Sequence, residues 1–318
     1  MLFKAAFSAL SPAGPRGRLS ILIFHRVLPA ADPLFPGEIT QPQFDAICTW
    51  LRQWFNVLPL DLAAARLQEG TLPSRALCIT FDDGYADNHD VALPVLQRHG
   101  LCATFFVATG FLDGGRMWND TLIECVRRAA GPTLDLAGTP AAGLGSLPLG
   151  SIAQRQVAIA RAIGAAKYLP PPERDAWVDA FAARTGAALP DDLMMRSSQV
   201  RQLHQAGMQI GGHTVGHPIL ARLAVADITH EIAEGRRQLQ DIVAEPVTLF
   251  AYPNGKPGED YDDRAVQAVR EQGFKVAVST TWGTSDRRSD PLQLPRFTPW
   301  DRQRARFGLR LARMLAQR

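Results

Sequence analysis

The sequence has 318 residues, enough for one large α/β domain or two small ones, and its 46% hydrophobic and 20% charged residues are ordinary for a globular protein. A formal net charge of +3 is too small to indicate a nucleic-acid-binding protein. The sequence contains no run of about 18 apolar residues, so we expect no membrane-spanning helix.

The N-terminal segment, residues 1–18, does not have the pattern of a signal peptide. It begins with a short, mildly apolar stretch that contains one positive charge, on Lys4, and a run rich in proline, glycine and arginine follows at once. A signal peptide needs a longer apolar segment. We therefore expect a cytoplasmic protein, or one attached peripherally to the inner surface of the membrane. The four cysteines show no CxxC spacing and are expected to be reduced core residues.

Short apolar runs of the kind found in strands covered on both faces recur along the chain. The first is Leu19–Phe24, and further strands are expected at 56–60, 76–80, 102–108, 208–211, 248–251 and 274–279. Helical patterns separate most of these strands, at 44–54, 91–99, 198–206, 227–243 and 264–272. The alternation predicts parallel βα units and, with about seven strands, a distorted (β/α) barrel. An open, doubly wound sheet is the alternative.

Two parts of the chain fall outside this alternation. Residues 113–195 contain helical stretches, a part rich in glycine, proline and alanine, and a proline run, and are expected to form a mostly helical insertion in a barrel domain at 19–300. From residue 302 onward the chain carries six arginines and no acidic residue, interleaved with apolar residues. We expect 301–318 to be a basic helix that either packs on the domain through its apolar side or contacts an anionic membrane surface.

Two adjacent carboxylates, Asp82 and Asp83, follow a predicted strand, and His213 and His217 follow another. In barrel enzymes the chemistry takes place at the C-terminal ends of the strands. One carboxylate and two neutral imidazoles form a common ligand set for catalytic Zn²⁺. Alone, each motif is more often structural, but together they predict a metal centre. Because neighbouring side chains of a strand point to opposite sides, one aspartate is expected to bind the metal and the other to act as a base.

The segments Thr80-Phe81-Asp82-Asp83-Gly84 and His213-Thr214-Val215-Gly216-His217 resemble the first two motifs of the polysaccharide deacetylases, the NodB-type domain of carbohydrate esterase family four. The resemblance covers most of the chain outside the insertion. It implies a distorted (β/α) barrel and a metal-dependent hydrolase that removes N-acetyl groups from amino sugars. On the matching positions, Asp83, His213 and His217 would hold the metal and Asp82 would be the general base. Zn²⁺ is expected, although Co²⁺, Ni²⁺ or Fe²⁺ also suits these ligands.

The third family motif, Arg-Pro-Pro-Tyr-Gly in its common form, is matched loosely by Ala251-Tyr252-Pro253-Asn254-Gly255. The resemblance implies that the backbone N–H of Asn254 donates to the oxyanion of the reaction. Ala251 stands where many members have an arginine that pairs with the base. Arg296 is a candidate replacement at the mouth of the barrel, and a structural salt bridge is the alternative reading of this residue.

The last family motif normally carries a histidine that protonates the leaving amine, but no histidine occurs after His230. His25, directly after the first predicted strand, resembles the early histidine of the circularly permuted exopolysaccharide deacetylases. This resemblance implies that His25 is the general acid, with a structural imidazole as the alternative. Trp282 and Trp118 join Arg296 as candidate substrate-binding residues, although the ring of Trp282 could instead close the barrel.

The predicted function is therefore the metal-dependent removal of N-acetyl groups from N-acetylhexosamine units of a polysaccharide or glycan precursor. Two alternatives remain open. Because the motif arginine and the late histidine are missing, the chain could be a catalytically degenerate carbohydrate-binding barrel. It could also be an amidohydrolase that acts on a small non-sugar amide. The expected partners are the glycan substrate and, through the basic C-terminal segment, the membrane surface; nucleic acid is not expected.

Overall fold

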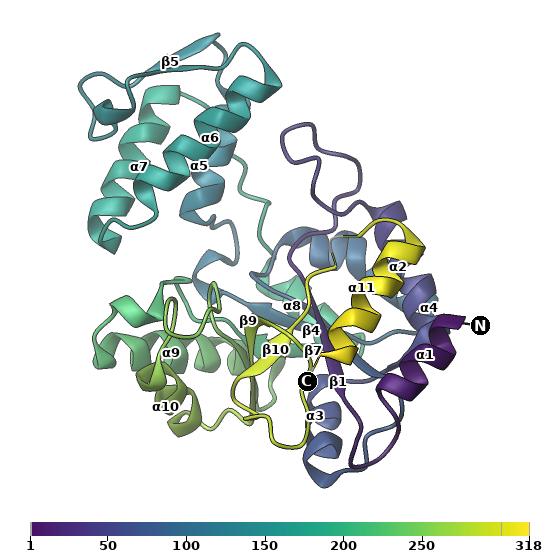
Figure 1. Cartoon of the computed structure of the whole chain (residues 1–318). Helices are drawn as coiled ribbons and strands as arrows, with labels where there is room; N and C mark the ends of the chain where they lie inside the picture. Colours follow the sequence, from purple (N-terminus) through teal and green to yellow (C-terminus); the bar gives the residue numbers. More distant parts are fainter. Residues whose placement is uncertain (1, 300, 318) are drawn as a thin grey trace. The chain divides into compact units, whose positions relative to one another are not determined.

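The computed structural model describes residues 2–299 and 301–317, and its larger compact unit contains a barrel of parallel strands (Figure 1). Within the described residues, seven strands follow one another around the barrel: β1 (Leu19–Phe24), β3 (Ala76–Phe81), β4 (Thr104–Val107), β7 (Gln209–Gly212), β8 (Leu249–Ala251), β9 (Val276–Trp282) and β10 (Leu294–Arg296). The barrel is nearly closed beyond β10, because the N–H of Phe297 donates to the carbonyl of Ile21 at 2.7 Å and the N–H of Ile23 donates to the carbonyl of Phe297 at 3.0 Å. The predicted distorted (β/α) barrel is confirmed, and the open sheet is excluded.

One predicted strand lies outside this barrel. Of residues 56–60, only β2 (Asn56–Val57) is extended, and it pairs with β3 beside the barrel. The chain then enters α3 (Leu60–Glu69), whose buried residues recur at helical spacing. The seventh barrel strand is instead β10. The apolar pattern missed it because β10 has three residues and Pro295 at its centre, where a strand is not expected.

Alternate residues of the strands face the inside and the outside of the barrel. Ala76 and Cys78 of β3, and Leu294 of β10, belong to the apolar cluster inside. The same alternation continues along β3 to Thr80 and then to Asp82, which therefore follows the inward-facing row. The strand pattern thus decides which of the two adjacent aspartates is directed toward the interior of the barrel.

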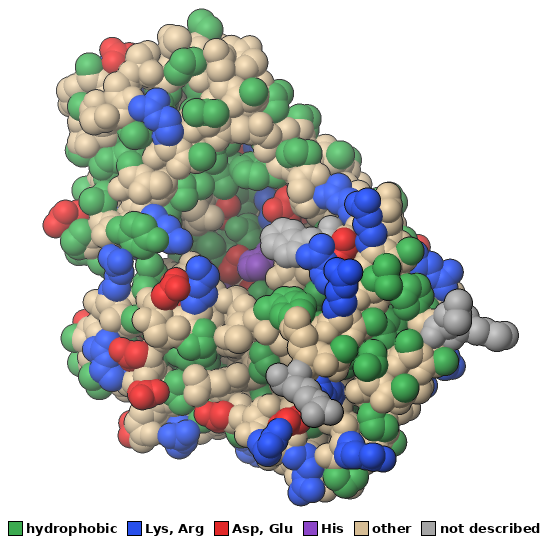
Figure 2. Space-filling view, in the orientation of Figure 1, with side chains coloured by type: hydrophobic (Ala, Val, Ile, Leu, Met, Phe, Trp, Pro, Cys, Tyr) green, Lys and Arg blue, Asp and Glu red, His purple; other side chains and the backbone are tan. Residues whose placement is uncertain are grey.

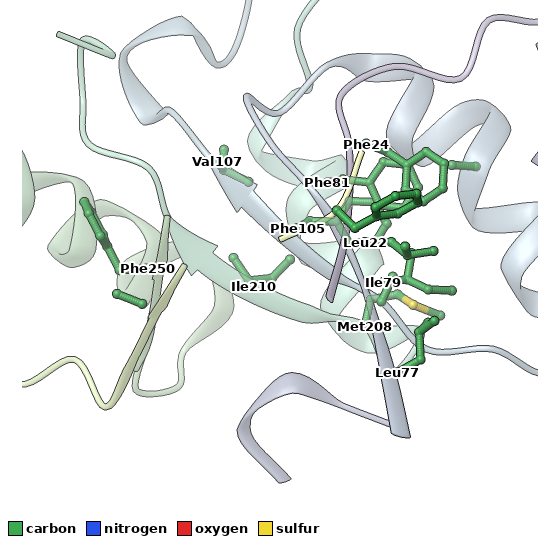
Figure 3. Close-up of a cluster of buried hydrophobic side chains, with 14 of the residues drawn as sticks. Leu22, Phe24, Leu77, Ile79, Phe81, Phe105, Val107, Met208, Ile210 and Phe250 are labelled. Carbon is green, nitrogen blue, oxygen red and sulfur yellow. The ribbon is translucent and has the colours of Figure 1, made fainter. Parts of the chain in front are cut away.

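Helices cover the outside of the barrel and enclose a second apolar core. They include α2 (Gln41–Trp54), α4 (Leu93–His99), α8 (Ser197–Gln205), α9 (Val225–Val243) and α10 (Asp263–Glu271), and the π-helical turn η1 (Asn88–Ala92) precedes α4. In the part of this core shown in Figure 3, the ring of Phe81 stacks on Phe24 and Phe105, with centroids 5.3 and 4.8 Å away. Burying each such ring contributes roughly 1.5–3 kcal/mol, which makes the β1-β3-β4 wall a firm support for the residues at its end.

A second compact unit comprises Asp113–Met194 together with Ala31–Glu38. It contains α5 (Trp118–Arg128), the antiparallel pair β5 (Thr133–Asp135) and β6 (Ser146–Pro148), α6 (Ile152–Ala166) and α7 (Pro171–Thr185), and it has its own apolar core. Helix α7 begins at the proline run of the insertion, because proline is well tolerated in a first helical turn. The segment 31–38 was not predicted to belong to this unit. It is attached there by the ion pair of Asp32 with Arg127, 2.6 Å long.

Helices α1 (Leu2–Leu10) and α11 (Arg304–Ala316) pack on each other near the end of α2. A Cβ on Gly308 would lie 2.6 Å from the ring of Phe3, so any larger residue there would displace this ring. The apolar side of α11 is buried against the barrel unit. Its arginine side is exposed, and Figure 2 shows Lys and Arg side chains beside hydrophobic ones on this face.

No described helix is both long and apolar enough to cross a membrane. The four cysteines are free, and three of them are buried.

Candidate active site and metal centre

The two aspartates leave β3 in different directions. The N–H of Asp82 still donates to the carbonyl of Phe24 on the neighbouring strand at 2.9 Å, so Asp82 continues the strand. Asp83 then has a φ of 79°, and Gly84 has a φ of 91°. A positive φ is costly for a residue other than glycine and is often found at functional sites. This turn breaks the strand alternation and allows the two neighbouring carboxylates to have different partners.

Asp83 meets the two histidines of the second motif. The Oδ1 atom of Asp83 is 3.3 Å from Nε2 of His213 and 3.4 Å from Nε2 of His217. These separations are long for hydrogen bonds. They match the spacing of roughly 3.3–3.4 Å between ligand atoms that surround Zn²⁺ tetrahedrally at roughly 2.0–2.1 Å. The three potential ligand atoms lie within 4.8 Å of one another. The residues therefore fit a metal ion both by donor type and by spacing.

The backbone orients the first of the two candidate histidine ligands. Nδ1 of His213 lies 2.7 Å from the carbonyl oxygen of Ala251, and a carbonyl only accepts, so Nδ1 carries the proton. In the neutral ring, Nε2 is then the unprotonated nitrogen, and it lies 3.3 Å from Oδ1 of Asp83. A partner of this type fixes the ring and tautomer of a metal-binding histidine. Position 251 thus acts through its backbone, although its side chain is the alanine that departs from the family motif.

Burial and charge set the protonation of the three groups. Burial alone would raise the pKa of Asp83, but His213 and His217 hold it well below its usual range. Burial lowers the pKa of His217 to about 4. It acts in the same sense on His213, where the carboxylates of Asp83 and Asp82 outweigh it and raise the pKa. An ionised carboxylate and a neutral His217 near neutral pH are the forms in which these residues bind metals.

Asp82 forms a buried, bidentate ion pair with Arg296. Two guanidinium nitrogens of Arg296 donate to the two oxygens of Asp82, both at 2.7 Å, and its Nε donates to the carbonyl of Ser279 at 2.9 Å. The side chain of Arg296 is 0% exposed. Burial raises the pKa of Asp82, but Arg296 and His213 outweigh it and bring the pKa below its usual value. The structure therefore places Arg296 against the carboxylate predicted to be the base and out of reach of a substrate.

His25 is exposed and lies immediately after β1. Two buried side chains from the segment after Gly84 form hydrogen bonds with the backbone at and near His25. The side-chain amide of Asn88 donates to the carbonyl of His25 at 2.8 Å. One oxygen of Asp87 accepts the N–H of Val27 at 3.0 Å, and the other pairs with Arg26 at 2.8 Å. His25 is close enough to lower the pKa values of both motif aspartates. The structure thus brings His25 to the same end of the barrel as the aspartates.

Asn254 lies in the turn after β8, next to the carbonyl that holds His213. Its φ is 58°, its side chain is exposed, and its carbonyl accepts a hydrogen bond from the hydroxyl of Thr280 at 2.8 Å. Its backbone N–H has no hydrogen-bond partner among the described residues. A turn held in this conformation with a free amide is an arrangement that can donate to a developing negative charge.

The two candidate tryptophans occupy different units. Trp282 is the last residue of β9 rather than a residue after it, and the residue is 44% exposed. Trp118 begins α5 in the second unit, where its ring packs under the guanidinium of Arg174 at 5.2 Å. The barrel residues described above therefore assemble at one end of the parallel strands, with the exposed ring of Trp282 on a strand of that barrel. Figure 2 shows a histidine at the surface beside acidic side chains on the face in view.

Three residues that contact the site segments were not singled out in the sequence: Asp87, Asn88 and Glu231. The first two lie within a few residues of the Asp-Asp-Gly motif, and that proximity was the available signal. Glu231 lies in the pattern of an amphipathic helix, where an acidic residue reads as a solvated one. Only the folded chain shows that Glu231 contacts the loop between the two histidines.

Comparisons with known proteins agree with this geometry. The family model described as polysaccharide deacetylase matches residues 69–130 and 174–277. The chain is 21% identical over 272 residues to the putative polysaccharide deacetylase YxkH of Bacillus subtilis. The aligned region covers 85% of this chain and 67% of that protein. The fold is similar to that of the deacetylase PplD from Streptococcus pyogenes, with a TM-score of 0.62, 18% identity, and coverage of 94% of this chain and 99% of the other. It is also similar to that of IcaB from Ammonifex degensii, with a TM-score of 0.59, 18% identity, and coverage of 96% and 99%. The chain belongs to the polysaccharide deacetylase family.

Proposed function

We propose that the chain is a metal-dependent hydrolase that removes N-acetyl groups from N-acetylhexosamine units of a polysaccharide or a glycan precursor. The observation that carries the proposal is the pairing of a ligand set, Asp83, His213 and His217, with a neighbouring carboxylate, Asp82, that Arg296 holds ionised. The solved structure of PplD is a complex with acetate, the product that such a reaction releases. Family membership supports the reaction class, and the residues support its chemistry.

Asp83, His213 and His217 would hold the metal, with Zn²⁺ as the first candidate and Co²⁺, Ni²⁺ or Fe²⁺ as alternatives. When bound, such an ion polarises the amide carbonyl and lowers the pKa of water. The amide of an N-acetyl group needs both effects, because its carbonyl is a poor electrophile and neutral water is a poor nucleophile.

The remaining residues account for the proton transfers. Asp82 accepts a proton from the attacking water, whose oxygen forms a bond to the carbonyl carbon. The pair with Arg296 occupies one lone pair on each carboxylate oxygen and leaves the others available. The N–H of Asn254 donates to the oxyanion, and His25 gives a proton to the nitrogen as the C–N bond breaks. Acetate and a free amino sugar result.

Exposed aromatic and basic groups suit the rest of the substrate and its location. The exposed indole of Trp282 offers a flat apolar surface of the kind that stacks on a pyranose ring. Trp118 is only partly exposed and packs against the core of the second unit, and a substrate contact there stays a prediction. Side chains such as Arg306 and Arg313, on the exposed side of α11, would meet an anionic membrane surface if the substrate is a lipid-linked precursor.

The structure favours a hydrolase over the degenerate binding barrel, because each proposed reactive group has a supporting contact in the barrel unit. The test is acetate release from an N-acetylglucosamine oligomer by the purified chain, with chelation and Zn²⁺ restoration. We expect activity in the wild type, none in Asp82→Asn, and full activity in the control Asp241→Asn, a change on the exposed part of α9.

Two results would point elsewhere. Glycan binding without acetate release by the metal-loaded wild type would support the degenerate barrel. Turnover of a small non-sugar amide far above that of any glycan would support the alternative amidohydrolase. Retention of activity in Asp82→Asn would contradict the assignment of the base while leaving the reaction class intact.

A further inference from the structure

The loop between the two candidate histidine ligands has a costly backbone conformation. Thr214 has a φ of 67° and His217 has a φ of 52°, both in the left-handed region and neither at a glycine. Each such residue costs on the order of 1 kcal/mol or more and persists only when its surroundings impose it. Since His217 would be a ligand, whatever imposes this conformation also sets the position of a metal-binding nitrogen.

The carboxylate of Glu231, on α9, contacts the middle of this loop. Its Oε2 atom accepts the N–H of Val215 at 2.9 Å and the N–H of Gly216 at 2.8 Å. One carboxylate oxygen thus accepts hydrogen bonds from two consecutive backbone amides and fixes both of them. A Cβ on Gly216 would lie 3.3 Å from the other oxygen of Glu231, so the carboxylate fits closely against the loop.

One helical turn later, Gly235 allows the same helix to touch the start of the loop. A Cβ built on Gly235 would lie 3.0 Å from both the carbonyl carbon and the oxygen of Thr214. Residues four apart lie on the same helix face, so Glu231 and Gly235 form one contact surface. Glycine inside a helix costs roughly 0.5–1 kcal/mol relative to alanine, a cost that this close approach explains.

The loop backbone is completed by bonds from other segments. The N–H of Thr109 donates to the carbonyl of Thr214 at 3.2 Å, and the N–H of Gly110 donates to that of Val215 at 2.9 Å. The N–H of His217 donates to the hydroxyl of Thr214 at 3.0 Å. The amides from 215 to 217 therefore all have partners. Two of these three amides share one partner, the Oε2 atom of Glu231.

We propose that Glu231 is a positioning residue for the metal centre, which acts through the backbone of Val215 and Gly216 to hold the imidazole of His217 in place. This inference rests on the proposed metal dependence. The relevant property of Glu231 is an acceptor oxygen at the end of a side chain of the right length. A glutamine can supply that oxygen, whereas aspartate is one methylene too short and alanine has no acceptor.

The test is the affinity of the full chain for Zn²⁺ alone, measured by calorimetric titration after removal of metal, with the Co²⁺ absorption spectrum as a report on ligand geometry. We expect Glu231→Ala and Glu231→Asp to weaken Zn²⁺ binding roughly 10–100-fold, as is usual when the outer support of a ligand is lost. Glu231→Gln should stay within about threefold of the wild type. The control is Glu234→Ala, on the same helix, whose carboxylate pairs with Arg237, and it should change nothing.

A second variant separates positioning from folding. Gly235→Ala improves the intrinsic helix propensity of α9 but presses a methyl group against the backbone of Thr214. It should weaken Zn²⁺ binding and change the Co²⁺ spectrum while the metal-free chain still unfolds cooperatively.

The proposal is overturned if Glu231→Ala binds Zn²⁺ as the wild type does. It is also overturned if Glu231→Gln is as weak as Glu231→Ala, since charge and not acceptor geometry would then be responsible. If the wild type binds Zn²⁺ but releases no acetate from any glycan, the proposed function fails while the comparison of variants still decides the role of Glu231. A wild type that binds no divalent metal refutes both.

Discussion

Replacing Arg296 with methionine should leave the carboxylate of Asp82 buried without a countercharge. In the wild type the pair is bidentate at 2.7 Å, and its side chains are 0% and 3% exposed. Methionine retains most of the volume of arginine and removes both hydrogen bonds. Water cannot replace the lost partner without opening the barrel interior, so the variant must either bury an unpaired charge or neutralise it.

The cost follows from this burial. Removing one partner of a buried ion pair destabilises proteins by roughly 3–5 kcal/mol. For a unit of this size, each kcal/mol lowers the melting temperature by roughly 2–4 °C, so we expect a fall of roughly 6–20 °C. Burial then favours the neutral acid, which raises the pKa of Asp82 and deprives the proposed mechanism of its base at neutral pH. Arg296→Lys keeps the charge but not the paired geometry, so its effects should be intermediate.

Thermal unfolding and the pH profile of kcat/KM for acetate release measure these effects. The acid limb of the profile should move to higher pH in Arg296→Met, and kcat should fall more than KM rises. The control is Arg288→Met, which removes an arginine whose side chain is 91% exposed and should be nearly neutral. A melting temperature within 2 °C, roughly the least shift that 1 kcal/mol would cause, together with an unchanged profile, would refute the reasoning.

Three further predictions concern other parts of the molecule. Chelation should abolish acetate release and added Zn²⁺ should restore it, whereas His217→Ala should need at least about tenfold more Zn²⁺; restoration at wild-type concentrations would contradict the ligand assignment. Asn88→Ala removes the hydrogen bond to the carbonyl of His25, the proposed general acid, and should lower kcat more than it changes KM. A change in KM as large as the change in kcat would indicate a role in substrate binding. Asp32→Asn should destabilise the second unit by roughly 1–3 kcal/mol at pH 7. The Arg127 hydrogen bond lowers the pKa of Asp32 from its usual 3.8, so the stabilisation is full above that value and is lost as pH falls below it. In urea unfolding, the difference from the wild type should therefore shrink toward pH 3; a constant difference would mean that charge is not involved.

The apolar runs predicted most of the barrel because its strands are covered on both faces. β1 has the predicted limits, and all its residues are buried. The pattern failed where a barrel strand is too short to show an apolar run, and where an apolar run does not belong to a barrel strand. β10 is too short to form an apolar run, and residues 58–60 have the hydrophobicity of a strand but lead into a helix. In both cases tertiary pairing, which a single segment does not encode, decided the outcome.

The candidate reactive residues were accessible to sequence reasoning because they lie in short motifs at strand ends. Their supports were less accessible. Arg296 was considered as a partner of Asp82, but 214 residues separate the two, and only the closed barrel brings them together. Glu231 contacts the histidine loop from a helix, and no local pattern distinguishes it from a surface glutamate. Motifs thus indicate which groups are candidates for the reaction, and the fold determines what holds them.

The joining of the two ends of the barrel has a consequence for synthesis of the chain. The hydrogen bonds between Phe297 and β1 link residues that are among the most distant in the sequence, and β10 also delivers Arg296 to Asp82. Contacts of such separation form late, because a long loop must close first. During synthesis, Asp82 would therefore lack its countercharge until the residues up to Arg296 have emerged from the ribosome. The carboxylate proposed as the base acquires its partner in the same step that closes the barrel, so an unfinished barrel also lacks a finished active site.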